Sequence, residues 1–128
     1  MRDHEPLGEL ESKVMEAVWR RGPVTAREVC DGMTGRRERA YTTIMTTMDR
    51  LHRKGLLSRN KEGLAWRYKP ALSRADFERA VASTLASRIL SSNQETALSA
   101  FVDATASVDE SLLDRLRQLI DLRQRRPR

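Results

Sequence analysis

The spacing of the apolar residues changes twice along this chain, and this limits the folds open to it. Before position 56 they recur every three or four residues, as on the buried face of an amphipathic helix. Between positions 56 and 69 the pattern becomes strand-like, because Trp66 and Tyr68 alternate with Arg67 and Lys69. Beyond that the helical spacing returns. The sequence therefore predicts helices, then a strand pair, then helices again.

Three helices are expected before the strand pair. The first spans about residues 8–21. The second opens with a capping box, in which Thr25 accepts a hydrogen bond from the amide of Glu28 and the Glu28 side chain reaches back. The third spans about residues 40–54 and ends at Gly55, which is expected in the left-handed conformation that often follows a helix.

The strand pair completes the plan of the first domain. Residues 56–61 and 64–69 are expected to form a hairpin around the turn pair Glu62-Gly63. Three helices followed by a basic hairpin make a winged helix-turn-helix. We expect a mainly α-helical fold with a small β-hairpin wing, in which residues 1–72 form the winged helix-turn-helix domain and residues 73–128 form a second, three-helix domain.

The positive charge is concentrated in the middle of the chain. Residues 36–69 carry ten Lys and Arg against three Asp and Glu, whereas the net charge is −2 over residues 1–35 and +1 over residues 70–128. A basic block suits a polyanion, because each phosphate that it neutralises releases counterions. A solvated charged face would have the same composition, so the order of residues within the block must decide.

The third helix has one apolar and one polar face. At about 100° per residue, Ile44, Met48 and Leu51 form the buried stripe, and short threonine side chains point away near the start of the helix. Such side chains let a helix approach base edges in the major groove, and cations near its end can then reach backbone phosphates. Threonine is a mediocre helix former, so its repetition here indicates DNA contact rather than helix propensity.

The residues expected to touch DNA lie on this helix, just before it, and on the hairpin. They are Thr42, Thr43, Thr46, Arg50, Arg53, Lys54, Arg39, Lys61 and Arg67. Thr47 is expected to be structural. Asp49 either pairs with Arg53 one turn on or accepts a hydrogen bond from a cytosine amine. Trp66 and Tyr68 are expected to pack on the helices rather than stack on bases.

Three short amphipathic helices are expected after the hairpin, and they are too small to bury their own apolar stripes. Packing against the same helices of a second copy would cover them, and packing back onto the hairpin domain is the alternative. We expect a homodimer. The predicted dimerisation residues are Phe77, Val81, Leu85, Leu98, Phe101, Val102, Leu112, Leu116, Leu119 and Ile120.

Several other kinds of chemistry are not indicated by the sequence. The single cysteine, Cys30, excludes an internal disulfide and a multi-cysteine metal site, and it is expected to be a small core residue. No phosphate loop, dinucleotide fingerprint, secretory signal or run of 18 apolar residues is present. We therefore expect a cytoplasmic protein that is not an enzyme, with no cofactor, no metal and no membrane insertion.

One run in the third helix, Tyr41-Thr42-Thr43-Ile44-Met45-Thr46, is followed by Arg50-Leu51 and Lys54-Gly55-Leu56-Leu57. With these segments the sequence resembles the penicillinase-repressor (BlaI/MecI) family of bacterial transcription regulators over about residues 7–122. The resemblance implies a homodimeric winged-helix repressor that binds inverted repeats of the TACA/TGTA type in double-stranded DNA. It also implies C-terminal helices that interlock.

The resemblance further implies a sensor protease as a partner. Family members are inactivated by cleavage between an Asn and a Phe in the penultimate helix, and the matching positions here are Ala100 and Phe101. The chain departs from the family pattern at Ala100. It also departs at Ala40, where relatives often have a capping Ser, and it lacks the cysteine-rich motif of a copper-responsive branch.

Two other functions compete with a repressor. The first is a winged-helix adaptor for a protein partner, without sequence-specific DNA binding; the basic third helix and hairpin argue against it, because adaptor surfaces tend to be aromatic and apolar. The second is a ligand-sensing regulator with a pocket between its domains. The short chain and its few aromatic residues argue against a roomy pocket.

Overall fold

Residues 4–33 and 40–126 are described by the computed structural model of this chain, and they fall into two units. The first unit is Met1–Thr84 and the second is Leu85–Arg128. The chain passes from one to the other within a single helix. We describe each unit by itself.

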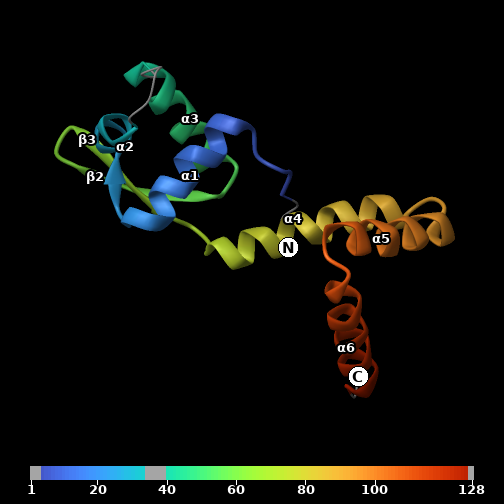
Figure 1. The fold of residues 1–128 in the computed structure, drawn as a ribbon. Helices are drawn as coiled ribbons and strands as arrows, with labels where there is room; N and C mark the ends of the chain where they lie inside the picture. The colour runs from blue at the N-terminus through green and yellow to red at the C-terminus, as the bar shows by residue number, and fades with distance from the viewer. Residues whose placement is uncertain (1–3, 34–39, 127–128) are drawn as a thin grey trace. The chain divides into compact units, whose positions relative to one another are not determined.

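The first unit contains three helices, a three-stranded antiparallel sheet and the start of a fourth helix (Figure 1). The expected three helices and the hairpin are confirmed. In chain order the elements are α1 (Glu9–Arg21), β1 (Val24–Thr25), α2 (Ala26–Gly32), α3 (Tyr41–Arg53), β2 (Leu57–Glu62), β3 (Ala65–Pro70) and α4 (Arg74–Leu90).

The ends of α2 and α3 follow from local chemistry. The capping box of α2 is confirmed, because the Glu28 amide donates to Thr25 Oγ1 at 3.1 Å and the Thr25 amide donates to Glu28 Oε1 at 2.9 Å. At the start of α3, Ala40 supplies no side-chain cap. Gly55 follows α3 with φ +85°, the left-handed conformation that its position predicts.

The sheet differs from the expected hairpin in two ways. Glu62 pairs with Ala65, so the two turn residues are Gly63 and Leu64, one position later than expected. Gly63 has φ +63°, as the first central residue of a type II′ turn requires, and this fixes the register. The short strand β1 adds a third strand beside β3 in the order β1-β3-β2. Its two residues are too few to show an alternating pattern.

The core of the first unit lies between α1, α2, α3 and the hairpin. Ile44, Met48 and Leu51 of α3 are fully buried, as the helical spacing predicts. Tyr68 is buried with them, and Cys30 packs against the same core. Because three successive turns of α3 contribute to this core, the opposite face of the helix is fixed in orientation.

The first part of α4 belongs to this unit, which ends at Thr84 rather than at residue 72. Phe77 is 9% exposed, and its ring centroid lies 5.7 Å from that of Trp19 and 5.8 Å from that of His4. Val81 packs against the same core. Of the predicted dimerisation residues, Phe77 is therefore covered by its own chain and Val81 is partly covered by it.

The second unit consists of the rest of α4 with α5 (Gln94–Val108) and α6 (Ser111–Arg125). Neither α5 nor α6 has a buried residue. The remaining predicted dimerisation residues all lie in this unit, and none of them is buried within the chain. In the described part of the chain, no helix combines the length and apolar character needed to cross a membrane.

Candidate nucleic-acid interface

The outward face of α3 carries short hydroxyl side chains at its N-terminal half. Thr42, Thr43 and Thr46 are exposed, whereas Thr47 is buried, as expected of a structural residue. The Thr47 hydroxyl donates to the Thr43 carbonyl at 2.8 Å. The division of the helix into a packed and an open face thus follows the sequence pattern residue by residue.

The exposed hydroxyl of Thr46 is already used as a donor. Thr46 Oγ1 donates to the backbone carbonyl of Thr42 at 2.9 Å. A hydroxyl has one hydrogen and two lone pairs, so in this rotamer Thr46 presents an acceptor oxygen and a methyl group to its surroundings. Such a side chain matches an exocyclic amine or a thymine methyl on a base edge.

Basic side chains lie at the C-terminal end of α3. Arg50 is exposed, and Arg53 Nη2 lies 2.9 Å from Asp49 Oδ2 with 78% of its side chain exposed. Lys54 Nζ donates to Glu11 Oε2 of α1 at 2.8 Å. Burial acts to raise the pKa of Glu11, but the Lys54 ammonium and the Gly8 amide together hold that pKa below its ordinary value.

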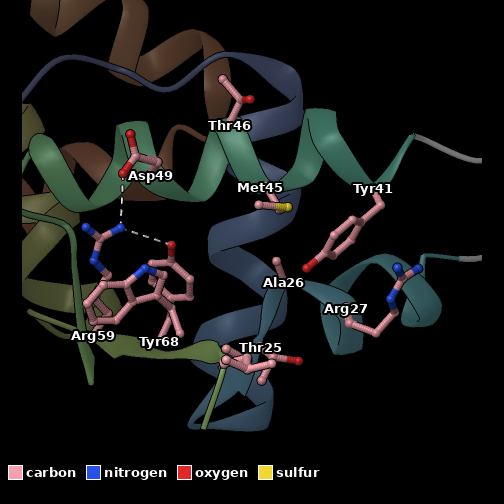
Figure 2. Close-up of a pocket in the computed structure, with 12 residues that line it drawn as sticks. Thr25, Ala26, Arg27, Tyr41, Met45, Thr46, Asp49, Arg59 and Tyr68 are labelled. Atoms are coloured by element: carbon pink, nitrogen blue, oxygen red, sulfur yellow. Dashed lines mark hydrogen bonds and ion pairs between the residues drawn. The ribbon is translucent and has the colours of Figure 1, made fainter. Parts of the chain in front are cut away.

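Asp49 is shared by two arginines, and its pair with Arg53 is the first of the two alternatives that the sequence left open. Besides its pair with Arg53, Asp49 Oδ1 accepts a hydrogen bond from Arg59 Nη1 of β2 at 3.0 Å. The same Nη1 donates to the Tyr68 hydroxyl at 3.3 Å (Figure 2). The contact with Arg59 links α3 to the hairpin. No helical spacing could have predicted it, since the partner lies on another element.

Trp66 does not pack on the helices as expected. It is 39% exposed, and the Arg59 guanidinium lies 4.2 Å from its ring centroid and Lys61 Nζ 4.7 Å from it. Alternation places Trp66 and Tyr68 on one face of β3, but only Tyr68 lies over the core. Lys61 remains an exposed cation near the hairpin turn.

A hollow of about 430 Å³ lies between α3, the start of α2 and the hairpin (Figure 2). Thr46 and the exposed Met45 contribute to it from α3, and Trp66 contributes from β3. At its edge the Arg27 guanidinium lies 4.0 Å above the ring of Tyr41. The predicted DNA-facing side of α3 therefore continues into a partly apolar, partly cationic depression beside the hairpin.

Arg67, a predicted phosphate contact, is engaged within the protein. Its guanidinium donates to Glu62 at 2.8 Å, to Glu28 at 3.1 Å and to the Pro23 carbonyl at 3.2 Å. The hydrogen bond to Glu62, followed by the charges of Glu62 and Glu28, raises the pKa of Arg67. Arg67 thus ties the middle strand to the cap of α2. Arg39, another predicted contact, lies outside the described residues.

The described residues offer no alternative metal centre, because no group of three or more His, Cys, Asp and Glu among them is arranged to hold an ion. His52 instead places Nδ1 3.0 Å from the carbonyl oxygen of Leu57, at the base of the hairpin. His4 and Cys30 lie in or against the apolar core.

Helices α2 and α3 with the sheet define a winged helix-turn-helix domain. The chain belongs to the penicillinase repressor family, whose sequence pattern matches residues 7–122. It is 34% identical over 111 residues to the transcriptional regulator BlaI of Mycobacterium tuberculosis, covering 85% of this chain and 80% of that one. It is 27% identical over 77 residues to the penicillinase repressor of Bacillus licheniformis, covering 60% of each chain.

A solved structure supports the same fold. The solution structure of the DNA-binding domain of the repressor BlaI matches this chain with a TM-score of 0.51 at 28% identity, covering 59% of this chain and 93% of that one. The family resemblance and the fold class expected from the sequence are both confirmed.

Proposed function

We propose that this chain is a transcriptional repressor that binds an inverted-repeat DNA operator as a homodimer, with α3 in the major groove. Family membership and the similarity to BlaI regulators support repression and DNA binding. By the same resemblance the operator is of the TACA/TGTA type. The observation that carries the proposal is the outward face of α3, with threonines at one end and cations at the other.

The two ends of this face have different roles. At the N-terminal end, the short side chains of Thr42, Thr43 and Thr46 allow close approach to base edges, with the exposed Met45 beside them. At the C-terminal end, Arg50 and Arg53 reach phosphates and set the position of the helix without reading sequence.

Phosphate contacts extend to the flanks of α3. Lys54 follows the helix and is half exposed despite its pair with Glu11. On the hairpin, Lys61 is the exposed cation nearest the turn. Arg67 has its donors engaged with Glu62, Glu28 and Pro23, so we assign it to holding the hairpin in place rather than to phosphate binding.

The homodimer is supported by the apolar surface of the second unit. Phe101 is 58% exposed, and Leu98, Val102, Leu119 and Ile120 are each about half exposed. Exposed apolar side chains in this number mark an association surface. A second copy of the same helices covers them in a two-fold arrangement and places two α3 helices on successive turns of DNA.

A mobility-shift titration combined with sedimentation tests this proposal. A duplex with TACA and TGTA half-sites should be retarded at physiological salt by a dimer, and a scrambled duplex should be retarded much more weakly. With six to ten phosphates neutralised per dimer, the affinity should fall by about 10³–10⁵-fold between about 50 and 200 mM salt. Equal binding to both duplexes, or no retardation, contradicts it and favours the protein adaptor.

Release by a sensor protease is part of the proposal through the family resemblance. The bond between Ala100 and Phe101 lies within α5, and both side chains are exposed. A helical segment must unwind locally to enter a protease site, so cleavage depends on how firmly α5 is packed in the dimer. Mass analysis of the chain recovered from induced cells tests whether this bond is cut.

A further inference from the structure

We infer that Arg59 is a positioning residue for DNA recognition, which holds the hairpin at a fixed place beside α3 and does not itself bind phosphate. The inference rests on the proposed function. It concerns a cation in the basic block that charge alone would assign to the DNA backbone, and the contacts of its side chain lead to the opposite assignment.

The guanidinium of Arg59 joins three elements. It extends from β2, donates to Asp49 of α3 at 3.0 Å, and donates to the hydroxyl of Tyr68 on β3 at 3.3 Å (Figure 2). Tyr68 is the cross-strand partner of Arg59, and it is buried in the core. One nitrogen of the side chain, Nη1, therefore joins the groove-facing helix to a buried residue of the sheet.

The side chain of Arg59 is also less accessible to a phosphate than that of Arg53. Its side chain is 21% exposed, against 78% for Arg53, although both arginines pair with Asp49. Its guanidinium carbon lies 4.2 Å from the centroid of the Trp66 ring, which covers one face of the group. To reach a phosphate, Arg59 would have to leave its hydrogen bonds and this ring.

The contact between Arg59 and Asp49 lies partway along β2, where it can hold the hairpin against α3. At the base of the hairpin, His52 already lies against Leu57 with 3.0 Å between Nδ1 and the carbonyl oxygen. Arg59 makes a second attachment farther along β2, and Lys61, two residues beyond it, is the predicted phosphate contact. Arg67 separately ties β3 to the cap of α2, but Arg59 fixes this part of β2 to α3, so the Arg59 contact sets the separation of Lys61 from Thr46 before DNA binds.

Preorganisation of this kind affects specificity more than general affinity. Random DNA is bound through phosphates, which a pivoting hairpin can still reach. Specific DNA requires α3 and the hairpin to engage at once in one geometry, so freedom of the hairpin is lost on binding. Loss of the Arg59 contacts should therefore weaken binding to specific DNA and leave binding to random DNA unchanged.

The test uses the duplex that the wild-type chain selects from a pool of random sequences, and a scrambled duplex of the same composition. Arg59→Gln should lower the affinity for the selected duplex by about tenfold or more, with the scrambled duplex and the salt slope unchanged. Arg59→Lys should behave like Arg59→Gln, because an ammonium lacks the planar face that lies against the Trp66 ring while Nη1 reaches Asp49 and Tyr68. Tyr68→Phe removes only the hydroxyl that accepts from Arg59, so it should lower the affinity for the selected duplex by a smaller factor.

Arg53→Gln is the matched control, because it removes the other partner of Asp49 from an exposed position. It should weaken both duplexes alike and reduce the salt slope by about 1 per chain. Hydrogen exchange without DNA gives an independent measurement. Amides of β2 and β3 should exchange faster in Arg59→Gln than in wild type, and those of α1 should not.

Two results overturn the inference while leaving the proposed function intact. One is an Arg59→Gln variant that behaves like Arg53→Gln, with a smaller salt slope and equal losses on both duplexes. The other is hairpin exchange that Arg59→Gln does not change. Failure of the wild-type chain to select any sequence overturns the proposed function itself, and the inference with it.

Discussion

The indole N–H of Trp19 donates to the backbone carbonyl of Leu72 at 3.1 Å, and this bond ties the segment before α4 to α1. The same indole packs on Phe77 one turn into α4. The first part of α4 is thereby held as a piece of the winged-helix unit.

This attachment predicts that Phe77 stabilises the first unit. Phe77→Ala removes a ring that is 9% exposed, so the free energy of unfolding should fall by about 3 kcal/mol. Trp19 and Trp66 are the two tryptophans of the chain, and both lie in the first unit, so urea unfolding followed by tryptophan fluorescence measures it. The matched control Phe101→Ala removes a ring that is 58% exposed and should leave this transition in place.

The rotamer of Thr46 predicts that its acceptor oxygen and its methyl group contact bases, because its hydroxyl hydrogen is donated to Thr42. Thr46→Val keeps the methyl group and replaces the hydroxyl with a second methyl, whereas Thr46→Ser keeps the hydroxyl and loses the methyl. A bidentate base contact is worth about 1–3 kcal/mol and Thr46 can make only a single one, so Thr46→Ala should reduce discrimination between the selected and scrambled duplexes by about fivefold. The Val and Ser variants then separate the two contributions. Unchanged discrimination in Thr46→Ala shows that this face does not read bases.

The exposed apolar side chains of the second unit predict that a charged substitution among them disrupts the dimer. Phe101→Asp places a carboxylate among apolar side chains, and association should fall because a buried, unpaired charge is costly. Sedimentation should show monomers at concentrations where wild type is dimeric, and operator affinity should fall with it. Gln118→Asp, at an exposed position on the face of α6 away from Leu116 and Leu119, is the control. A monomeric wild type contradicts the assignment.

The lowered pKa of Glu11 predicts that acid weakens the ion pair between Glu11 of α1 and Lys54 at the end of α3. Its pKa is lower in the folded chain than the ordinary value of about 4.5, so the folded state binds fewer protons there and loses stability as the pH falls through that range. Glu11→Gln should be less stable than wild type at neutral pH, and the difference should shrink at low pH. Glu9→Gln, an exposed position paired with Lys13 on the same helix, is the control. A difference in stability between Glu11→Gln and wild type that does not change with pH contradicts this prediction.

Much of this fold follows from local rules that the sequence displays. The burial of α3 on one side, the capping box of Thr25 and Glu28, and the left-handed Gly55 each depend on residues within one helical turn. The outward positions of Thr42 and Thr46 follow from the same periodicity. These features could be predicted because spacing alone determines them.

Other features depend on contacts between distant residues. The bridge from Arg59 to Asp49 joins two elements, and charge spacing along α3 shows only the pair with Arg53. Phe77 fits an apolar stripe equally well in a dimer or against Trp19, and only the packed structure decides. Trp66 alternates correctly with Arg67 but lies past the edge of the core. In each case the local pattern is right, and the partner is set by tertiary packing.

Chemical interference on the selected duplex tests the central claim most directly. Dimethyl sulfate marks guanine N7 in the major groove and adenine N3 in the minor groove. If α3 lies in the major groove, modified guanines in two half-sites about 10 base pairs apart should block binding, and modified adenines there should not. Interference only from adenines, or in one half-site alone, contradicts a dimer that reads DNA with Thr42 and Thr46.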